Sequence, residues 1–263
     1  MFYLPSSIFY LRSLPLPIKA ITFDFWSTLY QSKTVDYAKR LLTLKESVER
    51  GSGSKVEPEQ FEAAVKLARE TWSRTWAQEH RTMTAEEWLG VMLQDLRLTL
   101  ELEILAEIRL NMEHSILADA PTLAPEVSSV LPDLASRYRL AIISDTGITP
   151  GRVLRQLLEH DHLTQYFTHL TFSDEIGRSK PHPSAFLTTL AALGAAPAEA
   201  VHIGDLLRTD IAGAQAVGMR AVQYVGINHD QANGLEDGRK ITPDAVIQSH
   251  EELEPLLQRW NDG

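Results

Sequence analysis

The pattern of apolar and polar residues divides the chain into two kinds of region. From residue 34 to about residue 117, apolar residues recur three or four positions apart, as they do on one face of a helix. The segments 61–76 and 105–116 show this spacing most clearly. Thr84 followed by Glu87 is a capping box, which predicts the start of a helix. No strand-like alternation interrupts the region, so we expect an all-helical insertion.

The rest of the chain alternates short apolar runs with helix-like segments. The predicted strands are the runs 18–25, 140–144, 169–172, 201–204, 221–224 and 245–247. One predicted helix ends near residue 138. The others cover residues 149–160, 183–193, 209–217 and 251–260. Strands that alternate with helices pair in parallel through right-handed crossovers, which predicts the α/β class. The segment 226–244 is rich in Gly, Asn and Asp and is expected to be a mobile loop.

Composition narrows the class of partner. The 263 residues carry a formal net charge of −10, and no block of Lys and Arg occurs that could bind nucleic acid. The absence of cysteine excludes disulfides, thiolate metal ligands and cysteine nucleophiles. No apolar run approaches the roughly 20 residues that a membrane-spanning helix needs. Residues 1–17, interrupted by three prolines, make a weak signal peptide. We expect a cytoplasmic monomer or homodimer that binds neither nucleic acid nor membrane.

Polar side chains follow the ends of the predicted strands. Asp24 lies at the end of the first run, Ser144 ends the second run, and Asp205 with Asp210 follows the fourth run. Lys180 stands at the start of a predicted helix, where a cation is disfavoured unless an anionic group lies nearby. Ligands of open parallel sheets bind beyond the carboxyl ends of the strands. These residues are therefore candidates for one phosphate and metal site.

Each of these residues also has a structural interpretation when it is taken alone. Asp24 and Asp210 could cap helices, Ser144 could belong to a turn, and Lys180 could lie in solvent. Asp205 and Asp210 are so close in sequence that their carboxylates would repel without a cation between them. Mg²⁺ is the expected cation, because it binds one or two carboxylates together with water and substrate phosphate.

Four segments in this order resemble the motifs of the haloacid dehalogenase superfamily. Residues 23–29 match its first motif and residues 142–145 its second. Residues 179–183 match the third motif, and residues 203–210 match the fourth. The resemblance implies a Rossmann-like three-layer core with a mainly parallel sheet and an inserted all-helical cap domain. The core would comprise residues 1–32 and 120–263, and the cap would comprise residues 33–119.

The resemblance also implies roles for individual residues. Asp24 would be the nucleophile that forms an aspartyl-phosphate, and Lys180 would neutralise charge on the phosphoryl group. Thr28, Ser144 and Asp145 would bind the phosphate together with Lys180. The Mg²⁺ ligands would be Asp24, the backbone carbonyl of Trp26, Asp205 and Asp210. The expected substrate is a small phosphorylated metabolite.

Trp26 departs from the phosphatase pattern. Phosphatases of this superfamily usually carry a second aspartate two residues after the nucleophile, as the general acid and base. An indole only donates a hydrogen bond and cannot transfer a proton. General acid–base catalysis contributes about 10²–10⁴-fold, so turnover of ordinary alkyl phosphates should be slow. Asp145 or a group from the cap could take over this task.

Three alternatives stay open at this stage. A 2-haloacid dehalogenase would use no metal and would carry an aromatic residue at position 26, but it would lack Asp205. A phosphonate-cleaving enzyme would need a cap lysine, for which candidates exist. A non-catalytic member of the superfamily would bind a phosphorylated ligand or a partner protein without turnover. The candidate lysines of the cap are Lys33, Lys39, Lys45 and Lys55.

The predicted cap contains conspicuous aromatic and cationic side chains. Trp72 and Trp76 repeat at helical spacing, which favours burial between helices over contact with a ligand. Arg74 or Arg81 is a candidate for contact with a substrate anion. His80 and Trp88 are the other conspicuous cap residues.

Overall fold

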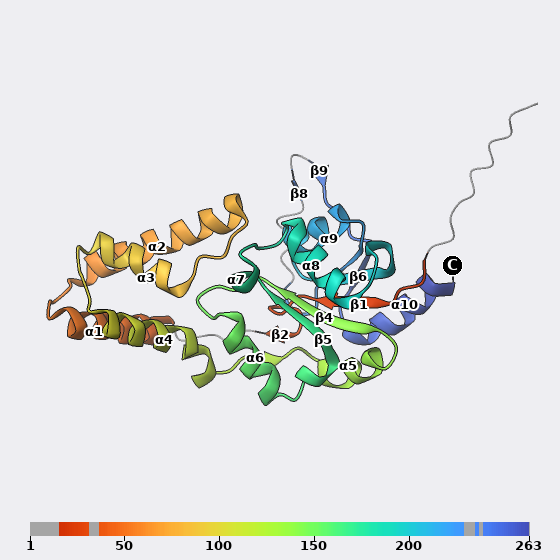
Figure 1. Ribbon diagram of the computed structural model, residues 1–263, viewed down its shortest axis with the longest axis horizontal. Helices are drawn as coiled ribbons and strands as arrows, with labels where there is room; N and C mark the ends of the chain where they lie inside the picture. Colours follow the sequence, from red (N-terminus) through yellow and green to blue (C-terminus); the bar gives the residue numbers. More distant parts are fainter. Residues whose placement is uncertain (1–15, 32–36, 229–234, 237–238, 263) are drawn as a thin grey trace, which may run out of the picture.

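The computed structural model describes residues 16–31, 37–228, 235–236 and 239–262. One six-stranded sheet lies at the centre of the molecule (Figure 1). Its strands are β1 (Ala20–Phe23), β4 (Arg139–Ser144), β5 (Phe167–Phe172), β6 (Ala200–Gly204), β7 (Arg220–Tyr224) and β10 (Ala245–Ile247). The strand order is β10-β7-β6-β1-β4-β5, and every neighbouring pair is parallel.

The topology of this sheet reverses beside β1. The chain first adds β4 and β5 on one side of β1 and then returns to add β6, β7 and β10 on the other side. Chain segments that leave such a point in opposite directions open a crevice at the carboxyl ends of the strands. The polar residues that follow β1, β4 and β6 therefore reach the same edge of the sheet.

The two faces of the sheet carry side chains of different size, because alternate residues of a strand point to opposite faces. One face presents large side chains such as Ile21 and Ile203, and the other presents Ala20, Ala141 and Ala200. The large side chains pack against α5 (Val127–Ala135), α6 (Gly151–His160) and α10 (Leu253–Asp262). The alanine face packs against α8 (Pro183–Leu193) and α9 (Ala212–Ala216). This is the expected three-layer α/β core.

Four helices form a separate group beside the three-layer core, on the left in Figure 1. They are α1 (Tyr37–Ser52), α2 (Pro58–Glu79), α3 (Ala85–Asp95) and α4 (Leu102–Ala118), and together they are called the cap below. The cap has its own apolar cluster, which includes Phe61, Leu89 and Met92. The predicted capping box is present, since Glu87 N donates to Thr84 Oγ1 at 3.2 Å and Thr84 N donates to Glu87 Oε2 at 2.8 Å.

Two short strands join the chain segments that enter and leave the cap. β2 (Tyr30–Gln31) and β3 (Thr122–Leu123) pair antiparallel, and Ala124 N donates to Leu29 O at 2.8 Å. The sequence did not predict this pair, because two residues are too few for an alternating pattern. The pair fixes both connections side by side at the base of the cap.

Other differences from the predicted elements are local. The helix expected over 209–217 begins as the π-helical turn η3 (Leu207–Ile211) before α9. The segment expected to be a loop contains the paired strands β8 (Leu235–Glu236) and β9 (Arg239–Lys240), while residues 229–234 and 237–238, like 1–15 and Lys33, lie outside the described residues. Short turns complete the description: η1 (Thr164–Tyr166), α7 (Ser173–Ile176), η2 (Pro197–Glu199) and η4 (His250–Glu252).

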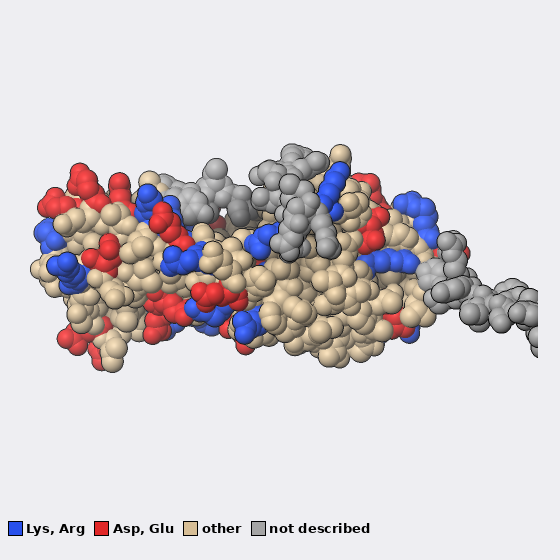
Figure 2. Space-filling model, turned by 90° about the horizontal axis from the view of Figure 1, so that it is seen from above, with Lys and Arg blue, Asp and Glu red and all other residues tan. Residues whose placement is uncertain are grey.

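The surface and the helices also bear on the expected partners. On the face drawn in Figure 2, Lys and Arg are interspersed with Asp and Glu over the cap. Such mixing differs from the clustered cations that bind nucleic-acid backbones. Among the described residues, no helix is long and apolar enough to cross a bilayer.

Candidate active site

A buried lysine joins two carboxylates at the carboxyl edge of the sheet. Lys180 lies just before α8, and its side chain is 2% exposed. The ammonium donates hydrogen bonds of 2.6 Å to Asp24 Oδ1 and to Asp210 Oδ1. Asp24 follows β1, and Asp210 lies in η3 after β6. Three segments that are far apart in the sequence therefore meet beside the point where the strand order reverses.

Asp205 completes an acidic trio with these two carboxylates. Carboxylate oxygens of Asp24, Asp205 and Asp210 all lie within 4.8 Å of one another. Gly204 permits this close approach, because a Cβ atom at that position would lie 2.3 Å from Asp210 Cγ. Asn228 Nδ2 donates to Asp205 Oδ2 at 3.0 Å. Hard oxygen donors at this spacing suit a small divalent cation.

The buried charges strongly perturb one another. Burial raises the pKa of Asp24 well above its usual range, with Lys180 opposing the shift and the other two carboxylates adding to it. Burial also raises the pKa of Asp205, to about 6, and Asp210 contributes to that rise. For Asp210, burial favours a higher pKa, but Lys180 and His202 outweigh it and lower the pKa. The raised pKa values of Asp24 and Asp205 indicate that Lys180 alone does not compensate three buried carboxylates.

His202 is a member of the cluster that the sequence analysis did not identify. It lies in β6, is fully buried, and its Nε2 is 3.0 Å from Asp210 Oδ1. Its Nδ1 is 2.8 Å from Thr22 Oγ1. Burial lowers the pKa of His202, so the ring is neutral and donates through Nε2 to the carboxylate of Asp210. His202 therefore orients Asp210 from beneath, and Leu206 N holds the other oxygen at 3.0 Å.

The predicted phosphate-binding residues lie at different depths. Asp145 lines the crevice, and its Oδ1 accepts a hydrogen bond of 2.8 Å from Lys180 N. Ser144 is buried at the end of β4, and its hydroxyl donates to the backbone carbonyl of Asp145 at 3.3 Å. Thr28 is also buried, and its hydroxyl has no hydrogen-bond partner among the described residues. Neither Ser144 nor Thr28 lines the crevice, so their phosphate contacts stay predictions.

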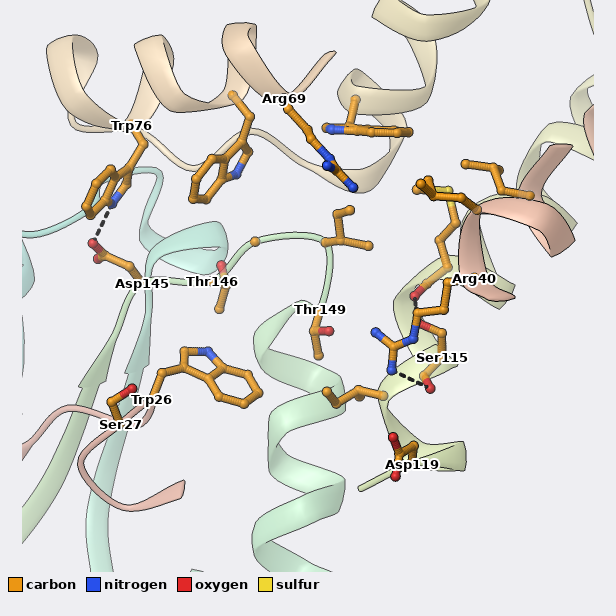
Figure 3. A pocket seen from close by; sticks show the side chains of 18 of the residues that line it. Trp26, Ser27, Arg40, Arg69, Trp76, Ser115, Asp119, Asp145, Thr146 and Thr149 are labelled. Atoms are coloured by element: carbon orange, nitrogen blue, oxygen red, sulfur yellow. Dashed lines mark hydrogen bonds between the residues drawn. The ribbon is translucent and has the colours of Figure 1, made fainter. Parts of the chain in front are cut away.

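The crevice opens into a cavity of about 1310 Å³ between the core and the cap. The acidic trio, Lys180 and Asp145 line its core end. Figure 3 shows the cavity with Trp26, Asp145 and Thr146 from the core on one side and α2 of the cap on the other. Reactive groups and a space for an organic molecule thus share one enclosure.

Comparison with known families matches residues 18–218 to the haloacid dehalogenase-like hydrolases. This match spans the cap and the strands β1, β4, β5 and β6 of the sheet. The chain belongs to the haloacid dehalogenase-like hydrolase family. It is an enzyme, which sets aside the interpretation as a non-catalytic binding protein.

Curated members of the family include two phosphatases that resemble this hydrolase. A phosphoglycolate phosphatase of Salmonella typhimurium is 28% identical over 187 residues, which is 70% of each chain. A glyceraldehyde 3-phosphate phosphatase of Methanothermobacter thermautotrophicus is 28% identical over 231 residues, covering 83% of this chain and 93% of the relative. Both of these relatives are phosphatases by name.

A solved structure in the family shows that fold and reaction are separate questions. The 2-haloacid dehalogenase of Pseudomonas syringae pv. Tomato DC3000 superimposes with a TM-score of 0.58 at 23% identity, covering 92% of this chain and 99% of the other. Such a likeness establishes only the fold of this hydrolase and not its reaction. The choice between phosphorus and carbon chemistry depends on the residues of the site.

The cap face of the hydrolase corrects one expectation. Trp72 and Trp76 are only half-buried, and both line the cavity instead of being buried between helices. Their rings stack with centroids 5.9 Å apart and planes within 8°. Trp76 Nε1 donates to Asp145 Oδ2 at 2.8 Å, so the indole is held by the core (Figure 3). The prediction was wrong because helical spacing fixes which residues share a face but not what that face contacts.

The cationic residues of the cap also differ from those expected. Arg81 pairs with Glu87 at 2.8 Å, Arg74 lies on the exposed side of α2, and neither lines the cavity. Arg69 and Arg40 line it instead, and both are labelled in Figure 3. Among the candidate lysines, Lys39 lines the cavity, whereas Lys45 and Lys55 pair with Glu49. The backbone carbonyl of His80 accepts a hydrogen bond of 2.8 Å from Ser179 N, next to Lys180.

Proposed function

We propose that this hydrolase is a Mg²⁺-dependent phosphatase that acts on a small phosphorylated metabolite through an aspartyl-phosphate on Asp24. The observation that carries the proposal is the buried contact of Lys180 with Asp24 and Asp210, next to the carboxylate of Asp205. The names of the two curated relatives, phosphoglycolate phosphatase and glyceraldehyde 3-phosphate phosphatase, support the same reaction class.

The residues of the trio fit a hard divalent cation. Asp24, Asp205 and Asp210 offer carboxylate oxygens, and with the ammonium of Lys180 they leave a formal charge of −2. When bound there, Mg²⁺ would supply the positive charge that stabilises phosphoryl oxygens during transfer. The backbone carbonyl of Trp26 is proposed as a further ligand on the basis of the family resemblance.

The chemistry of the protein groups follows from their positions. A carboxylate oxygen of Asp24 would attack the phosphorus atom, and the bond from phosphorus to the leaving oxygen would break. Lys180 is held 2.6 Å from Asp24, so its ammonium would contact the phosphoryl oxygens as negative charge develops on them. Water would then attack the phosphorus of the aspartyl-phosphate, which releases phosphate and restores the carboxylate. Thr28, Ser144 and Asp145 are proposed to help bind the phosphate.

Trp26 sets the expected speed of the first step. It lines the cavity where a second aspartate would provide the proton for the leaving group, and its indole carries no transferable proton at neutral pH. Burial raises the pKa of Asp145, but both of its oxygens already accept hydrogen bonds, from Trp76 Nε1 and from Lys180 N, so it is poorly placed to donate a proton to a leaving group. We therefore infer that substrates with poor leaving groups react slowly.

The proposal is tested by phosphate release from 4-nitrophenyl phosphate in Mg²⁺ and in EDTA. We expect activity in Mg²⁺, loss of activity in EDTA, and a fall of at least about 10³-fold in Asp24→Asn, because the nucleophile is removed. Asp133→Asn, an exposed position on α5, is the matched control and should keep full activity. Mg²⁺ should also raise the melting temperature of the wild-type protein, since a ligand of the folded state stabilises it.

Dehalogenation is the alternative that an aromatic residue at position 26 favours. Its test is chloride release from 2-chloropropionate in EDTA, followed in the same preparations. Chloride release without metal, together with no phosphate release, would reject the phosphatase. The carboxylate of Asp205 argues against this outcome, because a metal-independent reaction gives an acidic trio no purpose.

A further inference from the structure

Tryptophan is concentrated at one place in this protein. Four of the five tryptophans of the sequence, Trp26, Trp72, Trp76 and Trp88, line the cavity between core and cap. The fifth, Trp260, lies on α10 and packs under the guanidinium of Arg220 at 4.8 Å. Trp88 is buried in the cap, while the other three cavity tryptophans are half-buried and expose ring surface to the space. The cavity wall is therefore aromatic on both sides.

The rings of this wall are held in fixed orientations. Trp76 is fixed by its hydrogen bond to Asp145 and by the guanidinium of Arg208, which lies 4.6 Å from the ring centroid. Trp72 is stacked on Trp76 and packs partly against the apolar cluster of the cap. Trp26 lies on the opposite side of the cavity from α2 (Figure 3). Indole rings therefore line the cavity on both sides, and such rings stack on flat aromatic groups.

The size of the cavity exceeds what a phosphoryl group alone requires. Pockets for drug-sized ligands span about 300–1,000 Å³, and this cavity measures about 1310 Å³. From the cap side the lining includes the cations Lys39, Arg40 and Arg69, with the carboxylate of Asp119 at the end of α4. The core end carries the acidic trio, whereas Arg69 extends from α2 into the cavity at the cap end (Figure 3). The occupant should therefore have a phosphate at one end, a flat body, and a second anionic group at the other.

We propose that the natural substrate is an aryl phosphate, in which the phosphate is carried on an aromatic ring that binds between Trp26 and the Trp72–Trp76 pair, with a second anionic group on Arg69. This inference rests on the proposed phosphatase reaction and names its substrate class. It also accounts for Trp26. The bond from phosphorus to the aryl oxygen breaks as the bond to Asp24 forms, and the electron pair leaves on a phenolate. A phenolate needs no proton in order to depart at a useful rate, unlike an alkoxide.

Binding is measured by isothermal titration calorimetry in Mg²⁺ with non-hydrolysable phosphonates. Phenylphosphonate should bind about tenfold more tightly than methylphosphonate, which is the size of effect that base–aromatic stacking produces. Trp72→Leu should reduce this preference to about threefold or less, because half of one stacking surface is lost. Trp260→Leu is the matched control and should retain the full preference, because its ring is outside the cavity.

The proposed contact between Arg69 and a second anionic group of the ligand is tested with two arginine variants of α2. 4-Phosphonobenzoate, which adds a carboxylate to the ring, should bind about fivefold more tightly than phenylphosphonate, as expected for one charge-assisted contact. Arg69→Gln should remove this gain, and Arg74→Gln should keep it, because Arg74 lies on α2 outside the cavity.

Kinetics separate this inference from the proposed reaction. Acetyl phosphate has a good leaving group but no ring, so Trp72→Leu should raise KM for phenyl phosphate at least about threefold more than it raises KM for acetyl phosphate, while Trp260→Leu should change neither. Turnover of acetyl phosphate with equal affinity for phenylphosphonate and methylphosphonate would overturn the aryl substrate and leave the phosphatase standing. Ring-dependent binding without phosphate release from any compound would reject the phosphatase and also the aryl phosphate as its substrate.

Discussion

The core edge and the cap wall of the cavity are built by opposite means. At the core edge, Asp24, Lys180 and Asp210 are buried and hold one another through charge-assisted hydrogen bonds, with His202 below them. At the cap wall, half-buried rings such as that of Trp72 are held by stacking and face the cavity. Buried charges tolerate almost no change, because each one left unpaired is costly. Aromatic contacts are graded, and their loss weakens binding without dismantling the site.

The largest difference in stability between the two regions is expected on replacement of Lys180. Lys180→Met removes the only cation between Asp24 and Asp210 among the described contacts of these two carboxylates, so the free energy of unfolding should fall by about 3–5 kcal/mol. Urea unfolding measures this, and added Mg²⁺ should restore part of the loss, because the cation replaces the missing charge. Lys19→Met, which breaks an exposed ion pair with Glu199, should change stability by less than about 1 kcal/mol. Equal effects of the two variants would show that the buried cluster is not under electrostatic strain.

A pair of glycines gives the next largest contrast. Gly204→Ala places a Cβ atom 2.3 Å from Asp210 Cγ, so it should destabilise the protein by about 1–3 kcal/mol. It should also displace Asp210 and lower the affinity for Mg²⁺. Gly90→Ala, in the exposed interior of α3 with no atom within 4 Å, should stabilise the protein by about 0.5–1 kcal/mol. Urea unfolding of both variants checks the opposite signs, and a neutral Gly204→Ala would contradict the tight packing described at the core edge.

Trp76 links the two regions and should show an intermediate effect. Trp76→Phe keeps a ring but removes the hydrogen bond from Nε1 to Asp145, which should cost about 1 kcal/mol of cap–core contact. Loss of that contact should raise KM for 4-nitrophenyl phosphate by roughly fivefold, with a smaller change in kcat. Trp260→Phe serves as the control for loss of an indole outside the cavity. The hydrogen bond has no role in the cap–core contact if both variants show the same KM.

Arg81 should show the smallest effect, although the sequence makes it conspicuous. Its partners Glu79 and Glu87 are exposed, so Arg81→Gln should change the free energy of unfolding by less than about 1 kcal/mol. KM for 4-nitrophenyl phosphate should stay unchanged, since Arg81 does not line the cavity. A steady-state assay checks this expectation, and a clear rise in KM would move the substrate site toward the start of α3.

The core was predictable because its signals are local. Short apolar runs that end in Asp24, Ser144 or Asp205 define both a strand and the place where its last side chain emerges. Period-two alternation then fixes which face each neighbour occupies. His202 was missed for the complementary reason. Its position within an apolar strand predicts burial, but its contact with Asp210 depends on η3 turning back over β6, which no local pattern encodes.

The cap was predictable in its helices and not in its contacts. The capping box at Thr84 and the helical spacing identified α2 and α3 correctly, since both depend on residues within one turn of each other. The roles of Trp72 and Arg69 could not be assigned in this way, because a helix in the cap has one face toward its neighbours and another toward the core. The choice between these faces depends on how α2 is placed over the cavity.

The amino-acid sequence by itself determined the alternation of strands and helices, the all-helical insertion, and the chemical groups at the strand ends, because these follow from periodicity and from residue type. Only the tertiary structure decided that Lys180 bridges two carboxylates and that four tryptophans surround one cavity. Such contacts join residues from separate elements, and they form only when the sheet and the cap fold against each other. The physical reason is that distances between elements are set by packing, which depends on the whole chain at once.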